Sequence, residues 1–324
     1  MTMTTAATTA TTTATATAPT TAPGTTEHTP VTARTVTIGG ARVHYDIAGT
    51  GSPDALPDGF PDGSPDGSPD GSPDESPTEP PLLLVHGTGS GGAVINWGQT
   101  APRFTDSRTV ITPDLSGADR TVDDGAPLTV EALAAQVVAV IEDAGLGPVD
   151  LLGFSMGAPV SAAVAALRPE LVRRLILVAG WEHTEGDEYL RNNFTLWQRL
   201  GENDPAAFGR FVTMTGFSRG FLNGIGREGV EALIPNMPPT PGTLRHVAVD
   251  LAVDIRALLP RIAAPTLVIG ATQDATVPVE HSRRLAAAID GSRYAEIDAG
   301  HVAFFEKEDE FVATVADFLA GRAA

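Results

Sequence analysis

The sequence predicts an α/β protein with a mostly parallel, doubly wound sheet and a small helical insertion. Short apolar runs rich in β-branched residues alternate with segments of helical periodicity, as in folds built from β-α-β units. A Gly-Phe-Ser-Met-Gly sequence at 153–157 joins one such run to an Ala-rich helical segment. The alternation stops at 181–242, where aromatic residues are frequent. We therefore expect a core made of 33–180 and 243–324, with 181–242 as a helical cap on it.

The elements of the core have local reasons in the sequence. Two alternating runs flank the glycines at 39–40, which predicts an antiparallel hairpin. Thr129 is a favourable N-cap residue, and Gly145 is a favourable helix end, so a helix is expected between them. Strands are expected at 35–38, 42–47, 82–85, 108–113, 149–152, 174–178, 265–269 and 293–297. Helices are expected at 93–104, 129–144, 158–167 and 244–259, from 279 onward, and at the C-terminus up to 318.

Two segments lack any pattern of buried residues. Residues 1–32 are mostly Thr, Ala and Pro, and the segment 50–81 contains tandem Pro-Asp-Gly-Ser units. Neither can bury enough apolar surface to offset the entropy lost on ordering, so we expect both to be disordered. A calcium-binding repeat is a less favoured interpretation of the second segment. Its Asp residues recur every four positions, without the ligand pattern or the closing Glu of an EF-hand loop.

Composition limits the classes of partner. The chain of 324 residues has a formal net charge of −19, and much of the excess lies in the acidic insertion. An acidic surface argues against nucleic acids and anionic membranes as partners. The N-terminus has neither the basic region nor the apolar core of a signal peptide, and we expect a cytoplasmic protein. With 0 Cys there is no thiol chemistry, and the oligomeric state stays open.

The serine at the centre of 153–157 is the strongest candidate for chemistry. A G-x-S-x-G sequence between a strand and a helix forms a sharp turn that lifts the serine hydroxyl clear of the sheet. The flanking glycines avoid the clash that a Cβ would make in this turn. The helix that follows points unpaired N–H groups toward any oxyanion formed there. Ser155 is therefore the predicted nucleophile.

A serine hydroxyl needs a base to accept its proton, and the base needs an anion to orient it. Asp274 follows the apolar run 265–269, and His301 follows the run 293–297. Ligand chemistry in open α/β sheets gathers where parallel strands end. The order Ser, Asp, His therefore predicts a catalytic triad of Ser155, Asp274 and His301.

These motifs resemble those of the α/β-hydrolase superfamily, particularly its small capped members such as esterases, lactonases, perhydrolases and C–C bond hydrolases. The resemblance covers the chain from about residue 33 onward, except for the insertion. It implies the α/β-hydrolase fold and an oxyanion hole made by the backbone N–H groups of Thr88 and Met156. The loop 112–117 also matches the family, but the next residues, 118–121, read Ala-Asp-Arg-Thr and depart from it. There we expect a similar turn with altered polarity.

The resemblance implies a serine hydrolase that cleaves an ester or lactone through an acyl-Ser155 intermediate. Acyl transfer to another acceptor, C–C bond hydrolysis and peracid formation use the same residues and stay open. A non-hydrolytic role as a binding protein or cyclisation scaffold is the alternative from another class. Ser155 in place of an Asp nucleophile argues against an epoxide hydrolase or dehalogenase.

Contacts with substrate are predicted at the strand ends and at the start of the cap. Trp181, His183, Val277 and Val302 are the candidates, and the aromatic cap indicates an apolar small-molecule substrate. His86 is expected to make structural hydrogen bonds. The sequence shows no metal-ligand cluster, and 87–92 lacks the Lys of a phosphate-binding loop, so we expect neither a metal nor a cofactor.

Overall fold

The computed structural model describes residues 31–49, 79–118 and 120–322. Most of the predicted disordered segments, 1–32 and 50–81, lies outside these residues. The folded part begins slightly earlier than predicted in both places. Val31 pairs with Ala48, and Glu79 pairs with Arg108, so strand pairing extends beyond the apolar runs that the sequence displays. Among the described helices, none combines the length and apolarity needed to cross a bilayer.

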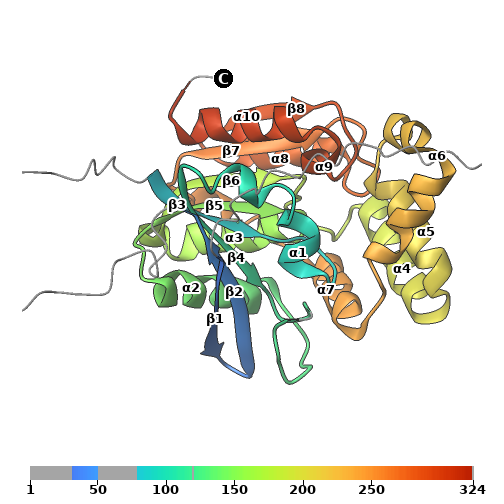
Figure 1. The fold of residues 1–324 in the computed structure, drawn as a ribbon, viewed down its shortest axis with the longest axis horizontal. Helices are drawn as coiled ribbons and strands as arrows, with labels where there is room; N and C mark the ends of the chain where they lie inside the picture. Colours follow the sequence, from blue (N-terminus) through green and yellow to red (C-terminus); the bar gives the residue numbers. More distant parts are fainter. Residues whose placement is uncertain (1–30, 50–78, 119, 323–324) are drawn as a thin grey trace, which may run out of the picture.

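The described chain forms an 8-stranded sheet in the order β1-β2-β4-β3-β5-β6-β7-β8 (Figure 1). Strands β1 and β2 form an antiparallel hairpin, β2 pairs antiparallel with β4, and the remaining pairs are parallel. This confirms the predicted mostly parallel sheet. The strands are β1 (Val31–Ile38), β2 (Ala41–Ala48), β3 (Glu79–Val85), β4 (Arg108–Asp114), β5 (Val149–Phe154), β6 (Val172–Val178), β7 (Thr266–Ala271) and β8 (Arg293–Ile297).

Helices cover both faces of the sheet, which explains why its central strands read as continuous apolar runs. Every residue of β5 and β7 is buried. One apolar core lies between the sheet and the helices α2, α3 and α8; the other lies between the sheet and α1, α9 and α10. The flanking helices are α1 (Gly92–Trp97), α2 (Val130–Ala144), α3 (Gly157–Leu167), α8 (Val279–Ala288), α9 (Ala303–Glu306) and α10 (Glu308–Leu319).

Helix α2 shows the local signals acting as predicted. The Thr129 hydroxyl accepts a hydrogen bond from the Ala132 amide at 3.1 Å and caps the first turn. Gly145 ends the helix in the left-handed conformation with φ of 69°. The expected helix at 93–104 is shorter than predicted. It divides into α1 and a 3₁₀ turn at Ala101–Arg103, with Pro102 inside the turn.

The helix predicted at 244–259 is also shorter. Helix α7 spans Pro241–Ala252, and a 3₁₀ turn follows only at Leu259–Arg261. Between them the chain pairs with the start of the predicted cap. The Thr184 amide donates to the Val253 carbonyl at 3.0 Å, and the Ile255 amide donates to the Glu182 carbonyl at 2.8 Å. A long-range pairing therefore replaced the helical turn that local periodicity predicted.

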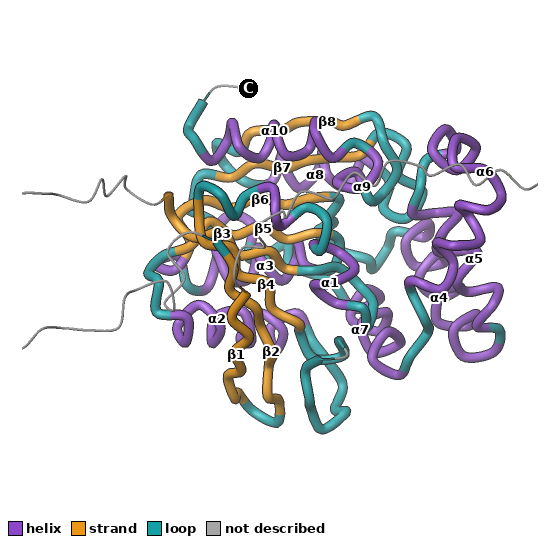
Figure 2. The backbone as a smooth tube through the Cα atoms, in the orientation of Figure 1, coloured by secondary structure: helices purple, strands orange, loops and turns teal. Residues whose placement is uncertain are grey.

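The segment expected to be a cap forms three helices and a 3₁₀ turn, which we call the helical insertion. They are α4 (Glu188–Asn203), α5 (Pro205–Gly216), α6 (Arg219–Leu233) and Ile234–Asn236. Figure 1 shows α4, α5 and α6 gathered at one side of the sheet, and Figure 2 shows the loops that join them to the core. Side chains of Asp187, Asp204 and Ser218 cap the three helices. Helix α4 has 16 residues, so this part is less fragmented than the short helices predicted.

Candidate active site

Ser155 occupies a tight turn between β5 and α3. Its φ of 53° lies in the left-handed region that side-chain-bearing residues rarely adopt. Its amide donates to the Val178 carbonyl at 2.9 Å and ties the turn to β6. A Cβ on Gly153 would lie 2.1 Å from the Gly157 carbonyl oxygen, and one on Gly157 would lie 2.6 Å from the Val85 carbonyl oxygen. Glycine at both positions is therefore required by the close approach of the backbone.

The structure brings the three predicted triad side chains together from the ends of β5, β7 and β8. His301 Nε2 lies 2.9 Å from Ser155 Oγ, and His301 Nδ1 lies 2.7 Å from Asp274 Oδ2. An ionised carboxylate only accepts hydrogen bonds, so Nδ1 carries the proton and Nε2 accepts from the Ser155 hydroxyl. All three residues are buried. This arrangement allows His301 to take the proton of Ser155.

Backbone groups hold Asp274 in place. Its Oδ1 accepts hydrogen bonds from the Thr276 and Val277 amides, both at 2.8 Å. These bonds leave Oδ2 directed at His301. Val277, a predicted substrate contact, has a buried side chain that does not line the cavity described below. Val277 instead helps to orient the acid.

The loop after β3 carries the predicted oxyanion donor Thr88. The Gly87 amide donates to Asn96 Oδ1 at 3.1 Å, the Gly89 amide to His246 Nδ1 at 3.2 Å, and the Ser90 amide to Thr243 Oγ1 at 3.1 Å. No hydrogen bond of the Thr88 amide is found in the described part of the chain. Met156, the other predicted donor, is the N-cap residue of α3.

The His86 ring supports this loop through hydrogen bonds of both its nitrogens. Its Nδ1 lies 2.7 Å from the Gly87 carbonyl, and its Nε2 lies 3.0 Å from the Leu115 amide. The amide can only donate, so Nε2 accepts and Nδ1 carries the proton. Burial is the main cause that lowers the pKa of His86. The neutral ring with both nitrogens engaged agrees with the structural role expected for it.

The family loop departs from its pattern at Arg120. This side chain donates to Asp114 Oδ2 at 2.5 Å and to Asp46 Oδ2 at 2.6 Å. Asp114 also accepts from the Ala93 amide at 2.8 Å, which fixes the start of α1. The altered polarity predicted for this loop is thus an ion-pair cluster next to α1. Asp119, the other unusual residue, lies outside the described residues.

A cavity of about 340 Å³ opens onto Ser155 and His301 between the core and the helical insertion. This volume falls in the range of small-molecule sites. Val302, one of the predicted substrate contacts, is among the residues that line the cavity. Apolar side chains dominate its walls: Phe154, Trp197, Val212, Phe217, Met237 and Val302.

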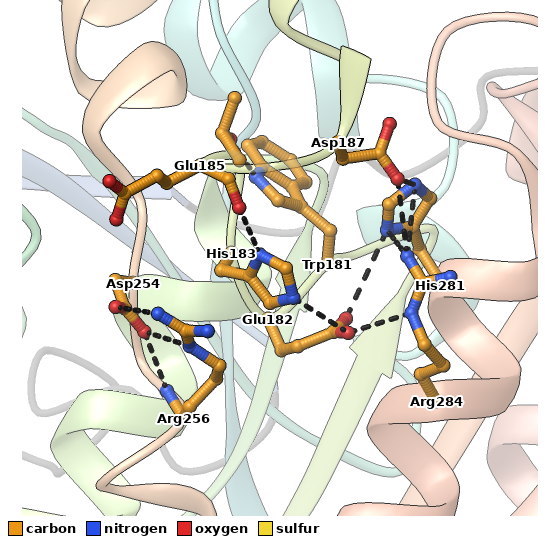
Figure 3. A network of polar contacts seen from close by, with 10 residues as sticks. Trp181, Glu182, His183, Glu185, Asp187, Asp254, Arg256, His281 and Arg284 are labelled. Carbon is orange, nitrogen blue, oxygen red and sulfur yellow. Dashed lines mark hydrogen bonds and ion pairs between the residues drawn. The ribbon is translucent and has the colours of Figure 1, made fainter. Parts of the chain in front are cut away.

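Trp181 and His183, two further predicted contacts, lie outside this cavity. The Trp181 ring is fully buried against Phe194, and its Nε1 donates to Thr184 Oγ1 at 2.9 Å. His183 accompanies it in the polar network of Figure 3, with its Nδ1 2.8 Å from the Glu185 carbonyl. Packing at the start of the insertion takes both side chains away from the cavity.

The polar network in Figure 3 was not predicted. Glu182 accepts from Arg284 Nε at 2.7 Å and lies 3.9 Å from His281 Nδ1. Burial by itself would raise the pKa of Glu182, but the nearby His281 ring, backbone hydrogen bonding and Arg284 outweigh it and lower the pKa to about 2. The network joins the segment after β6 to α8 and therefore anchors the insertion.

Three side chains of α7 were also missed. Thr243, His246 and Asp250 are fully buried and bind the loop that carries Thr88. Their spacing of three and four residues places them on one face of the helix. The signal that could have found them was the presence of polar residues on the face of α7 that was expected to be buried. In the described residues, no group of three or more His, Cys, Asp or Glu could hold a metal ion.

The sequence model of the alpha/beta hydrolase family matches residues 82–314, and the chain belongs to this family. This confirms the resemblance inferred from the motifs. The match begins within β3 and includes the Ser155 turn, Asp274 and His301.

Several relatives of the chain are named as hydrolases. It is 40% identical over 243 residues to pyrrolizixenacetamide deacetylase of Xenorhabdus hominickii, an alignment covering 74% of this chain and 91% of that protein. It is 29% identical over 248 residues to 2-hydroxy-6-oxo-2,4-heptadienoate hydrolase of Pseudomonas putida, covering 74% and 89%. The crystal structure of the enol-lactonase from Burkholderia xenovorans LB400 matches with a TM-score of 0.71 at 21% identity, covering 89% of this chain and 100% of that one. This last likeness concerns the fold alone.

Proposed function

We propose that the protein hydrolyses an acyl bond of an apolar small molecule through an acyl-Ser155 intermediate. The observation that carries this proposal is the Ser155–His301–Asp274 chain, with contacts of 2.9 Å and 2.7 Å, at the wall of an apolar cavity. A nucleophile, its base and an orienting acid need contacts of this kind, which supports the proposal.

In the proposed reaction, His301 Nε2 removes the Ser155 proton while Oγ attacks the substrate carbonyl. The Thr88 and Met156 amides stabilise the oxyanion, and Asp274 stabilises the imidazolium. His301 then donates the proton to the leaving group. A water molecule, activated by the same imidazole, releases the acid and restores Ser155.

Esters and lactones are the substrates we favour. The cavity is mostly apolar, which suits a neutral acyl chain or ring better than a charged one. Acetamides are a second candidate, because the relative that is 40% identical is named a deacetylase of pyrrolizixenacetamide. An amide requires His301 to protonate a leaving amine, which the same geometry permits.

Fluorophosphonate labelling together with a substrate panel tests the proposal. The panel contains p-nitrophenyl esters of increasing acyl length, lactones and N-acetyl amines. We expect the probe to modify Ser155 in the native protein, and Ser155→Ala to lower kcat by about four to six orders of magnitude. Ser161→Ala is the matched control, since Ser161 is buried on α3, the helix that follows Ser155, and does not line the cavity.

The outcomes separate the alternatives. An unlabelled Ser155, or a Ser155→Ala variant with more than about a tenth of native activity, would contradict the acyl-enzyme mechanism. A labelled Ser155 with no turnover of the panel would instead favour transfer to another acceptor, C–C bond hydrolysis or a scaffold role.

A further inference from the structure

Side chains on one face of α7 form hydrogen bonds with three consecutive residues of the loop that carries the proposed oxyanion donor. Thr243 Oγ1 accepts from the Ser90 amide at 3.1 Å, and His246 Nδ1 accepts from the Gly89 amide at 3.2 Å. One turn further along, Asp250 Oδ2 accepts from the Thr88 hydroxyl at 2.7 Å. Successive loop residues thus meet successive turns of the helix, in antiparallel order.

Thr243 and His246 accept from backbone amides of the loop. Asp250 accepts from the Thr88 hydroxyl, so the backbone amide of Thr88 is not used in this contact. His246 is itself fixed, because its Nε2 lies 2.7 Å from the Ser116 carbonyl and donates to it. Asp250 is fixed through its own carbonyl, which accepts from Thr184 Oγ1 at 2.6 Å. The bond to Asp250 therefore sets the orientation of the Thr88 side chain, and with it that of the peptide.

We propose that Asp250 is a positioning residue that holds Thr88 so that its amide points at the developing oxyanion. The inference rests on the proposed function, in which that amide is an oxyanion donor. Asp250 does not line the cavity, so it acts through Thr88 and not on the substrate.

The surroundings of Asp250 keep its carboxyl neutral. Burial raises the pKa of Asp250 to about 8, and the hydrogen bond from Thr88 opposes this only in part. Its Oδ1 has no hydrogen-bond partner among the described residues. A neutral acid holds the Thr88 hydroxyl without placing a negative charge beside the oxyanion.

The titratable neighbours of Asp250 are either neutral at neutral pH or paired with other groups. On α7, burial is the main cause that lowers the pKa of His246 to about 3. On the loop after β3, the His86 ring lies 5.9 Å from that of His246, and burial lowers its pKa as well. On the segment after β6, the Glu182 carboxylate turns toward His281 and Arg284.

The charged side chain of Arg245 on α7 is also engaged elsewhere, with the loop between β4 and α2. Arg245 pairs with Asp123 at 2.8 Å. Ionisation of Asp250 above about pH 8 therefore introduces an unpaired negative charge beside the oxyanion donor, which disfavours the transition state.

Steady-state kinetics on the ester that the panel identifies, with paired variants, test the positioning role. Thr88→Val and Asp250→Leu both remove the hydrogen bond. We expect each to lower kcat by about 10- to 100-fold with KM within about twofold, because an oxyanion donor acts mainly in the transition state. Thr88→Ser should restore most of the loss seen in Thr88→Val, and Asp250→Asn should retain an acceptor and most of kcat.

The matched control is Thr266→Val. Thr266 is also buried and its hydroxyl donates to the Ala264 carbonyl at 2.9 Å, but it lies at the start of β7, away from the strand ends that carry the triad. This variant should lose stability without a change in kcat. The pH profile is the second readout. The native kcat should fall as the pH rises through about 8, and Asp250→Asn should lose that decline.

Two results would overturn the positioning role. The first is a Thr88→Val variant with native kcat, which stays informative even where Asp250→Leu fails to fold. The second is an alkaline decline that persists in Asp250→Asn. Either result, with Ser155 labelled normally by the fluorophosphonate, refutes this inference alone, whereas an unlabelled Ser155 in the native protein refutes the proposed function.

Discussion

Backbone groups orient the nucleophile and the acid of the proposed triad. The Ser155 amide donates a hydrogen bond to the Val178 carbonyl, and the Asp274 carboxylate accepts from the amides of Thr276 and Val277. Backbone groups in a fixed turn lose no side-chain entropy when they form these hydrogen bonds. The two side chains are therefore oriented before substrate binds. The turns that carry these contacts are local in sequence, which is why the sequence around each residue could suggest its role.

Asp250 gives a stability prediction at the same scale. Its pKa is raised from 3.8 to about 8 on folding, so the folded state holds a proton that the unfolded state releases. Its contribution to the free energy of unfolding is therefore fully present below about pH 4 and is lost as the pH rises to about 8. Asp250→Asn cannot ionise and does not lose this contribution. The free energy of unfolding of the variant should therefore rise relative to that of the native protein between about pH 4 and about pH 8.

Urea unfolding near pH 5, 7 and 9 measures this difference. The gap between Asp250→Asn and the native protein should widen from the first to the second condition and then level off near the third. Parallel pH dependence of the two proteins would show that Asp250 does not change its protonation on folding.

Among the elements, α4 connects the insertion to the core through a row of aromatic rings. Trp181 packs against Phe194 with ring centroids 5.3 Å apart, Phe194 meets Trp197 at 5.9 Å, and Trp197 meets Phe208 at 6.0 Å. Trp181 lies at the core end of this row, and Trp197 reaches the cavity. The effects of Trp181 on stability and of Trp197 on the cavity can therefore be tested separately.

Trp181→Ala should lower the free energy of unfolding by about 3–5 kcal/mol, since it removes a fully buried ring. Its KM should stay within about twofold of native, because the ring does not line the cavity. Trp197→Ala should change both stability and KM. Urea unfolding and initial-rate kinetics on the same ester series measure both quantities. A KM change in Trp181→Ala as large as that in Trp197→Ala would return Trp181 to the substrate contacts predicted from the sequence.

For the molecule as a whole, the cavity exists only because the insertion closes over the strand ends. Val212 on α5 and Val302 after β8 both line it, although 90 positions of sequence separate their numbers. The size of substrate that the protein accepts should therefore depend on residues of the insertion as much as on residues of the core.

Val212→Trp should fill part of the 340 Å³ cavity. We expect kcat/KM to fall by at least about tenfold for the longest acyl chains accepted and to change little for acetyl esters, because overlap grows with the size of the ligand. Val138→Trp is the matched control, since Val138 is also half-buried but lies on α2. An equal loss for all chain lengths would indicate damage to the proposed catalytic groups and not a change in pocket size.

The sequence by itself determined the fold class and the order of the apolar runs along the chain, and it pointed to Ser155, Asp274 and His301, which the structure brings together. These follow from local rules: glycines that a turn requires, apolar runs that a buried strand requires, and polar residues at strand ends. Only the tertiary structure decided that Trp181 and Val277 face away from the cavity and that α7 ends at Ala252. It also revealed that Asp250 reaches Thr88, 162 positions earlier in the chain. The physical reason is that side-chain direction and long-range pairing depend on neighbours that are distant in sequence, and local periodicity carries no information about them.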